Sequence, residues 1–223
     1  ALEKTGQSFK TMAITINGNG TITGISVGGL PDGIVDTDMI AASAVATAKI
    51  ADDAVTVAKA SGSVKGVQEV DQWRLNANKQ LSTSWSDITA DLERADNTFS
   101  THVGTGMSQS SGVFTFPSTG KWLIQANGYL YSSDQEMHYG QIRTVVSSDS
   151  GSNYTIVGYA VGNASSGGAY GNFNSVELID VTNASTFRVK FDVRSGAGGN
   201  NDYLVGYTGE NATSFIFTRV GDT

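Results

Sequence analysis

Two acidic residues, Asp134 and Glu136, come closest to a catalytic pair in this sequence. A glycosidase needs two carboxylates held at a set separation beside the bond that it cleaves. Both residues lie in a polar stretch, where carboxylates are usually just solvated. The two histidines, His102 and His138, have no neighbours that suggest a catalytic triad. The sequence therefore predicts a protein that is not an enzyme, with hydrolysis of surface polysaccharide as an alternative.

Two loops are better candidates for ligand binding. The ranges 162–174 and 195–202 combine glycine with polar and aromatic residues, which is typical of exposed loops that carry recognition. Aromatic rings in such loops can stack on a sugar, although they fill a core or an oligomer axis more often. The candidate ligand-binding residues are Tyr170, Phe173, Asn200, Asp202 and Tyr203.

The sequence indicates neither a cofactor nor a metal. It has no cysteine, which excludes disulfides, zinc–thiolate sites and thiol nucleophiles together. The stretches 149–153 and 200–202 are rich in the oxygen ligands that calcium accepts, but ordinary turns have the same composition. No helical pattern follows the glycines at 104 and 106, so they do not form a nucleotide-binding loop.

Composition restricts the partners and the fold class. The formal net charge of −7 argues against a nucleic-acid partner, which would require a basic surface. No apolar run approaches the roughly 18–20 residues of a membrane span, and no signal-peptide pattern opens the sequence. The 27 glycines, with abundant serine, threonine and asparagine, suit the many tight turns of an all-β fold.

Strands must position these loops. In the range 187–194, phenylalanine and valine alternate with charged residues, so one face should meet a core and the other water or a partner. About eight strands joined by glycine-rich loops predict a sandwich, jelly roll or barrel. The further strands are expected over 112–116, 121–131, 137–146, 154–161, 173–179, 203–207 and 214–220.

The chain divides into three predicted parts, which are an N-terminal attachment arm (1–31), a repeat stalk (32–70) and a β head (71–223). The arm contains two alternating segments around Asn17–Gly20, which is a strong hairpin signal because Asn and Gly tolerate positive φ. A lone hairpin is marginal in water, so the arm is expected to dock on another protein.

The stalk carries a repeat in which large apolar residues recur every fifth position, at Ile40, Val45, Ile50 and Val55. Five residues turn about 140° on an α-helix, so these side chains would scatter around it. On a strand, an odd step alternates the faces. Such a segment cannot bury its apolar residues alone but can bury them against copies of itself, which predicts a homo-oligomeric stalk. The alternative is an alanine-rich helix capped by Asp36 or Asp38.

The residues Gly112, Phe114, Pro117, Gly120 and Trp122 follow a Gly-x-Phe-x-x-Pro-x-x-Gly-x-aromatic pattern. In this, the chain resembles the tumour-necrosis-factor-like jelly rolls, which include the globular heads of complement's first component, and its final strand resembles their closing strand. The resemblance implies a jelly-roll sandwich and a tight homotrimer with an aromatic axis. The chain lacks the cysteines and the Gly-X-Y stalk of the complement proteins, so their ligands are not carried over.

The repeat stalk has a second resemblance. Its Ala-Val-x-x-Ala-Lys pattern is similar to segments of phage structural proteins, especially tail fibres of phages that infect marine cyanobacteria. The resemblance implies a homotrimeric tail fibre on the virion surface, whose arm binds another virion protein and whose head binds a host surface glycan or protein for adsorption. The alternatives are a capsid decoration or head-fibre protein of the same fold, the hydrolase named above, and a secreted trimeric ligand or lectin.

Overall fold

The computed structural model describes residues 15–16, 22–23, 40, 45, 50–51, 54–55, 66–196 and 201–223 of the 223-residue chain. The chain divides into two units, Ala1–Thr56 and Val57–Thr223. Strands are the regular structure of the described residues, and none of these residues belongs to a helix long and apolar enough to cross a membrane. The prediction of an all-β fold is confirmed.

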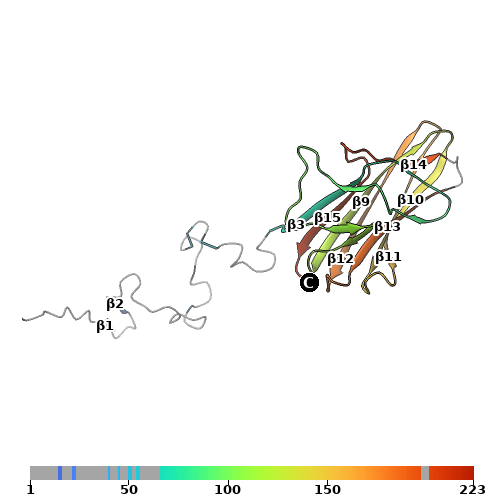
Figure 1. Cartoon of the computed structure of the whole chain (residues 1–223). Coiled ribbons are helices and arrows are strands. Elements are labelled where there is room, and N and C mark those ends of the chain that lie inside the picture. Colours follow the sequence, from blue (N-terminus) through green and yellow to red (C-terminus); the bar gives the residue numbers. More distant parts are fainter. Residues whose placement is uncertain are drawn as a thin grey trace, which may run out of the picture. The chain divides into compact units, whose positions relative to one another are not determined.

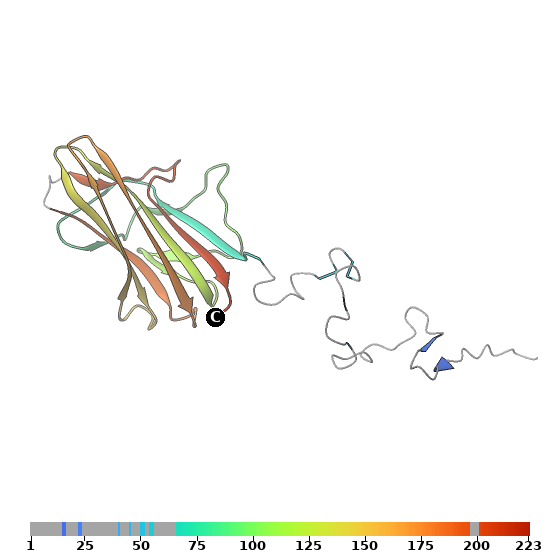
Figure 2. The same ribbon diagram turned by 180° about the vertical axis from the view of Figure 1, so that it is seen from behind.

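The second unit contains the head, which from Glu69 onward is a sandwich of two antiparallel sheets (Figures 1 and 2). The six-stranded sheet consists of β5 (Ser86–Asp87), β7 (Ser108–Ser110), β8 (Val113–Thr115), β10 (Met137–Ser147), β11 (Thr155–Ala164) and β13 (Arg188–Ser195). Its order is β11–β10–β13–β8–β7, and β5 also pairs with β13. The edge strand β11 therefore lies on one side and the short β7 on the other.

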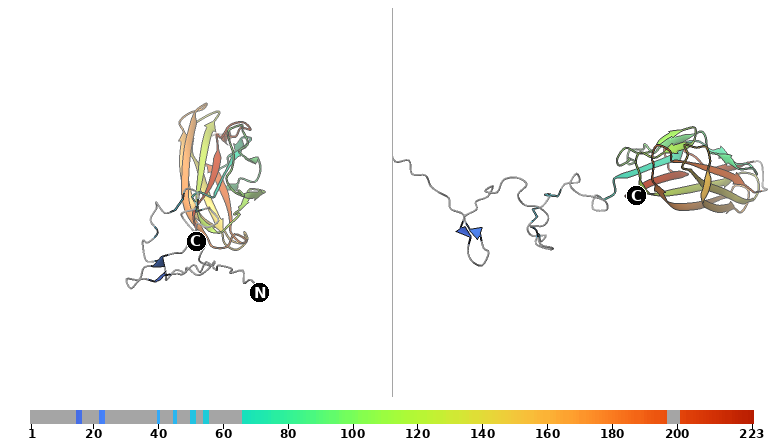
Figure 3. Two further views of the ribbon diagram at one scale, coloured as in Figure 1. Left: turned by 90° about the vertical axis from the view of Figure 1, so that its left-hand side faces the viewer. Right: turned by 90° about the horizontal axis from the view of Figure 1, so that it is seen from below.

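The seven-stranded sheet forms the second layer, and Figure 3 shows the head from two further directions. Its strands are β3 (Glu69–Leu75), β4 (Lys79–Gln80), β6 (Leu92–Arg94), β9 (Gly120–Ser132), β12 (Tyr170–Val181), β14 (Asp202–Leu204) and β15 (Ser214–Gly221). Its order is β4–β14–β9–β15–β3–β6, with β12 paired to β9 along all twelve of its residues. Neighbours in this sheet are distant in sequence, as expected of a jelly roll.

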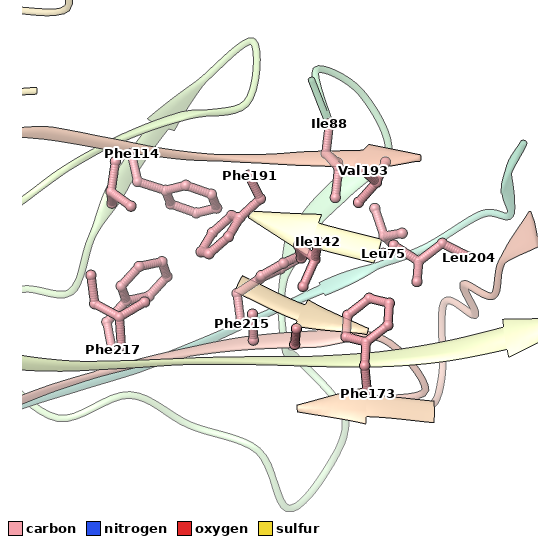
Figure 4. Packing of buried hydrophobic residues seen from close by; sticks show 14 of the residues in the cluster. Leu75, Ile88, Phe114, Ile142, Phe173, Phe191, Val193, Leu204, Phe215 and Phe217 are labelled. Carbon is pink, nitrogen blue, oxygen red and sulfur yellow. The ribbon is translucent and has the colours of Figure 1, made fainter. Parts of the chain in front are cut away.

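A cluster of phenylalanines joins the two sheets (Figure 4). The Phe114 ring from β8 lies 4.9 Å from the Phe217 ring of β15, and the Phe191 ring from β13 stacks on Phe215 at 4.3 Å between centroids. All four are at most 1% exposed. The alternation predicted for residues 187–194 is confirmed, because Val189, Phe191 and Val193 point into this core.

The glycine–aromatic motif has a direct structural role. Gly112 has φ +82°, and a Cβ there would lie 1.9 Å from the Ile88 carbonyl oxygen. After the turn, Trp122 is 1% exposed and its ring packs 5.3 Å from Phe116. The glycine of the motif therefore permits a tight turn next to Ile88, and its tryptophan packs into the core.

Strand β3 was not predicted, and it begins at Glu69, before the boundary at residue 71. Its pattern is irregular because two charged residues, Asp71 and Arg74, are each only 1% exposed. Asp71 pairs with Arg94 at 2.9 Å, and Arg74 pairs with Glu93 at 2.7 Å. Buried charges need such partners, and these partners come from β6, which no local pattern reveals.

In the first unit, β1 (Thr15–Ile16) pairs antiparallel with β2 (Ile22–Thr23), which confirms the predicted hairpin pairing. The residues Ile40, Val45, Ile50 and Val55 each lie at a bend of the chain, and none of the described residues of the predicted stalk is helical. The alternative of an alanine-rich helix is wrong at these positions. The caps proposed for it, Asp36 and Asp38, lie outside the described residues.

The motif glycine offers a stability test. We expect Gly112→Ala to lower the free energy of unfolding by about 2–4 kcal/mol, because the new Cβ meets the Ile88 carbonyl and alanine is disfavoured at positive φ. Gly209→Ala is the matched control, since no atom lies within 4 Å of its Cβ position. Urea unfolding of both variants measures the difference, and equal stability would contradict this account.

Candidate functional site

Three loops meet at one end of the head: the β9–β10 loop, the β11–β12 loop and the loop before β14. Backbone hydrogen bonds join them, because Ser133 N donates to Asn201 O over 3.1 Å and Gly168 N donates to Ser132 O over 2.8 Å. The two ranges that the sequence analysis selected as binding loops are thus neighbours in space. Exposed loops held together on a rigid sandwich are a common place for recognition.

This end lies opposite the end at which the chain enters the head, and we call it the distal end. Strands β3 and β9 are both antiparallel to β15, so they run in the same direction. The chain enters β3 at Glu69, whereas the three loops lie beyond Ser132, the last residue of β9. In Figure 1, β14 is accordingly remote from the C-terminus.

Four tyrosines gather on the seven-stranded sheet beside the distal end. The register explains this tyrosine cluster, because Tyr131 of β9 lies opposite both Tyr170 of β12 and Tyr203 of β14. Ring centroids are 4.8 Å apart for Tyr131 and Tyr170, and 5.1 Å apart for Tyr129 and Tyr170. Tyr170 remains 54% exposed, so the cluster offers aromatic surface to a ligand or another chain.

An open pocket of about 590 Å³ adjoins the cluster. It is lined by Tyr129, Tyr207, Thr208, Gly209 and Glu210. Aromatic faces next to hydroxyl and carboxylate groups suit a sugar, and they suit a protein contact equally well. The residues beyond Tyr207 were not recognised from the sequence, because the range 208–211 reads only as a polar turn.

The five predicted ligand-binding residues have different positions. Tyr170 and Tyr203 belong to the tyrosine cluster, and Asn200 lies outside the described residues. Phe173 is 5% exposed and points into the core (Figure 4), where its ring occupies the space beside Gly128. Asp202 is fully buried on the same side of β14 as Leu204. The prediction is therefore corrected for Phe173 and Asp202, which face inward and cannot contact a surface ligand.

The candidate catalytic residues are exposed. Asp134 and Glu136 both lie in the β9–β10 loop, and His102 and His138 lie elsewhere on the surface. Among the described residues, no group of three or more acidic or histidine side chains is arranged to hold a metal ion. This part of the head therefore presents solvent-exposed polar side chains.

The stretch 149–153 forms a self-contained turn. The Asp149 carboxylate accepts hydrogen bonds from the Ser147 hydroxyl at 2.6 Å and from Asn153 N at 2.9 Å and Nδ2 at 2.7 Å. These bonds lower the pKa of Asp149 to about 2. Its oxygens are thus used within the turn, as in an Asx-type motif.

The solvent face of the six-stranded sheet carries a group of stacked cations and aromatic rings that was not predicted from the sequence. The guanidinium carbons of Arg143 and Arg194 lie 3.9 Å and 4.5 Å from the centre of the Trp85 ring. Tyr159 meets the same ring edge-on at 6.1 Å, and Tyr139 lies 5.6 Å from Arg194. The alternating charged residues of 188–194 were the part of this group that the sequence made visible. Trp85 joins them only because β5 pairs with β13.

Two carboxyls lie beside this group. Asp192 of β13 pairs with Arg143 at 2.5 Å and lies opposite Asp87, which pairs with Lys190 at 2.6 Å. Burial raises the pKa of Asp192, and the Asp87 carboxylate raises it further, whereas Arg143 opposes the shift. The pKa of Asp87 is lowered: burial opposes this shift, but hydrogen bonding with Asp192 and the Lys190 ammonium outweigh it.

Comparison with solved structures places the fold. No protein-family model matches the chain, and no curated protein matches it either. The structure of Eiger TNF from S. frugiperda is 12% identical, with a TM-score of 0.50, and the match covers 69% of this chain and 93% of that one. Murine APRIL is 9% identical, with a TM-score of 0.45 and coverage of 68% and 98%. The head has a jelly-roll fold of the tumour-necrosis-factor type. The predicted all-β jelly-roll sandwich is confirmed.

The carboxyl pair makes stability depend on pH. A carboxyl whose pKa is higher in the folded state than in the unfolded state stabilises the fold while it is protonated. For Asp192 this contribution is complete below the ordinary pKa of 3.8, and it is lost as the pH rises from 3.8 through the raised pKa of the folded state. We therefore expect the difference in stability between Asp192→Asn and the wild type to shift in favour of the variant as the pH rises above 3.8, whatever the cost of leaving Arg143 without its partner. Thermal unfolding across this range measures the change, and its slope with pH is the readout. Asp180→Asn, which removes an exposed carboxylate paired with Lys121, is the control, and parallel slopes for the two variants would contradict the prediction.

Proposed function

We propose that this chain is the subunit of a homotrimeric virion fibre whose head adsorbs to the host surface. The observation that carries the proposal is a row of apolar side chains in the stalk segment. They recur at regular intervals and remain exposed in a single chain. Ile40, Val45, Ile50 and Val55 are between 41% and 58% exposed, and all four lie at bends five residues apart. Their burial requires other copies of the same segment, because each copy presents the same period.

The head has a second apolar surface that supports self-association. On β12, Val176 and Leu178 are 50% and 64% exposed, and both lie on the outer face of the seven-stranded sheet. Exposed apolar patches on stable domains usually mark interfaces. The tyrosine cluster lies on β9, β12 and β14 of the same sheet, so we assign it to this contact between copies, in keeping with the aromatic trimer axis that the family resemblance implies.

The order of the parts along the chain favours an attachment fibre. The stalk segment precedes β3, whose first residue lies at the end of the head opposite the distal loops. A fibre needs its anchor at one end and its receptor-facing loops at the other. The similarity of the stalk repeat to cyanophage tail fibres supports assignment to a virion, with the N-terminal arm as the attachment to another virion protein.

The oligomeric state is the first test. We expect a mass near three times the chain mass of 23.3 kDa by size-exclusion chromatography with light scattering. Leu178→Asp should shift the head toward monomers, because it places a charge in the proposed contact. Phe99→Asp is the matched control, since Phe99 is 96% exposed on the β6–β7 loop. A monomeric wild type would contradict the proposal.

Truncation separates anchoring from folding. A chain that begins at Gly66 keeps all of β3 and the bond from Gly106 N to Glu69 Oε2 at 3.0 Å, so we expect it to fold and to trimerise. It should not enter particles that lack the full-length protein, because the arm is missing. Complementation, with incorporation and adsorption scored separately, measures both. Incorporation of the truncated head would favour a capsid decoration protein instead.

Binding without cleavage separates a receptor-binding head from a hydrolase. Purified protein should adhere to susceptible cells without releasing reducing ends from their surface polysaccharide over several hours. If reducing ends are released, and Asp134→Ala or Glu136→Ala abolishes the release while Asp180→Ala does not, the protein is a hydrolase and the proposal of a pure adhesin is wrong.

A further inference from the structure

The solvent face of the six-stranded sheet differs in charge from the rest of this acidic chain. The chain has a formal net charge of −7, yet the four cationic side chains of β10 and β13 are accompanied by two carboxylates, Asp192 of β13 and Asp87 of β5. Two of the cations, Arg143 and Lys190, are neutralised by Asp192 and Asp87. The other two, Arg188 and Arg194, form no ion pair with any residue from 66 to 196 or 201 to 223. The face therefore retains local positive charge, which favours an anionic ligand.

Arg194 is held in place by stacking and by one hydrogen bond, and no described residue accepts a hydrogen bond from its Nη groups. Its Nε donates to Gln141 Oε1 at 2.6 Å, and its guanidinium lies against the rings of Trp85 and Tyr139. A planar guanidinium fixed by stacking, with its Nη edge free, is the geometry that binds a carboxylate with two parallel hydrogen bonds. By contrast, the Nη groups of Arg188 already donate to backbone carbonyls.

The surroundings of Arg194 suit a sugar more than a simple anion. Tyr159 is 52% exposed and lies edge-on to the partly exposed Trp85 ring. The exposed residues Ser82–Ser84 lead into Trp85, and Ser82 O accepts a hydrogen bond from Ser195 N, next to Arg194. Aromatic faces and hydroxyl groups around a fixed cation provide stacking and hydrogen bonds for a pyranose ring that carries a carboxylate.

The position of the face agrees with the proposed fibre. Strand β13 runs toward the distal end, because Ser195 N bonds with Ser82 O and Gly196 N bonds with Tyr139 O just before the loop that leads to β14. Arg194 is therefore beside the distal loops. It also lies on the sheet opposite to the tyrosine cluster, so the proposed contact between copies does not use it.

We infer that the surface formed by Trp85, Tyr139, Tyr159 and Arg194 binds an acidic polysaccharide through the carboxylates of its uronic acids. This inference rests on the proposed adsorption function and names the class of its ligand. The ligand's carboxylate lies on the Nη edge of Arg194, and a neighbouring sugar ring lies against Tyr159. The Arg143–Asp192 and Lys190–Asp87 pairs hold the sheet face beneath them.

The test uses the full-length protein and polygalacturonate, with highly methyl-esterified pectin as the uncharged polymer of the same backbone. Biolayer interferometry at constant ionic strength should detect binding to polygalacturonate and much weaker binding to the ester. Arg194→Gln should weaken binding on the order of tenfold or more, because it removes a charge-assisted bidentate contact. Arg219→Gln is the matched control: it removes the same charge from β15 of the other sheet and should bind like the wild type.

Additional binding measurements distinguish a uronic-acid ligand from other polyanions. Polyglutamate and duplex DNA carry anionic charge without uronic acid, and equal binding to either would overturn the inference in favour of a general polyanion surface. Tyr159→Ala should also weaken binding to polygalacturonate, and thermal unfolding of each variant verifies that it is folded. Wild-type binding by Arg194→Gln, or no binding of polygalacturonate by the wild type, would likewise overturn the inference. Neither result affects the adsorption and incorporation assays, which test the fibre proposal independently.

Discussion

The packing of phenylalanine rings between the two sheets is the interaction on which the rest of the head depends. Phe114 lies at its centre, with ring contacts to Trp73, Phe191, Phe215 and Phe217. These rings come from β3, β8, β13 and β15, so they join strands of both layers. Large buried rings contribute most of the apolar area of a core, and here they hold the sheets so that loops far apart in sequence meet at the distal end.

Each sheet has one face in this core and an outer face in contact with solvent. The outer faces of the two sheets carry different kinds of side chain. The seven-stranded sheet presents tyrosines and, on β12, exposed Val176 and Leu178. The six-stranded sheet presents charged residues stacked on Trp85. Apolar and aromatic surface favours permanent burial against another chain, whereas hydrated cations favour reversible contact with an anion. This difference is the physical basis for assigning self-association to one sheet and ligand binding to the other.

Buried charge marks the places where the fold departs from a simple apolar core. Asp71 and Arg74 on β3 are paired with Arg94 and Glu93, so the edge strand β6 is held largely by ion pairs and hydrogen bonds. On the opposite sheet, Asp192 is also a buried carboxyl with a cationic partner. Burial and the neighbouring Asp87 carboxylate disfavour its charged form, and so they raise its pKa. Removal of one member of such a pair leaves the other buried without a partner, which is strongly destabilising.

The sequence by itself determined the fold class, most of the strands from residue 112 onward and the hairpin pairing of β1 with β2. Local alternation carries this information, because the period of a strand is two residues and the turns use glycine and asparagine. It also identified the motif around Gly112, whose close approach to Ile88 needs a residue without a side chain. The five-residue spacing of Ile40, Val45, Ile50 and Val55 was likewise visible in the sequence.

Only the tertiary structure decided which loop residues are accessible and which side chains form a site. Phe173 and Asp202 were selected for their chemistry, but the register of β12 and β14 turns both inward. Strand β3 escaped prediction because its buried charges are satisfied by partners about twenty residues away. The stack of Arg143, Arg194 and Trp85 unites three segments of the chain, and only the pairing of β5 with β13 brings Trp85 to the two arginines. Contacts of this kind depend on strand order in the sheet, which local periodicity does not encode.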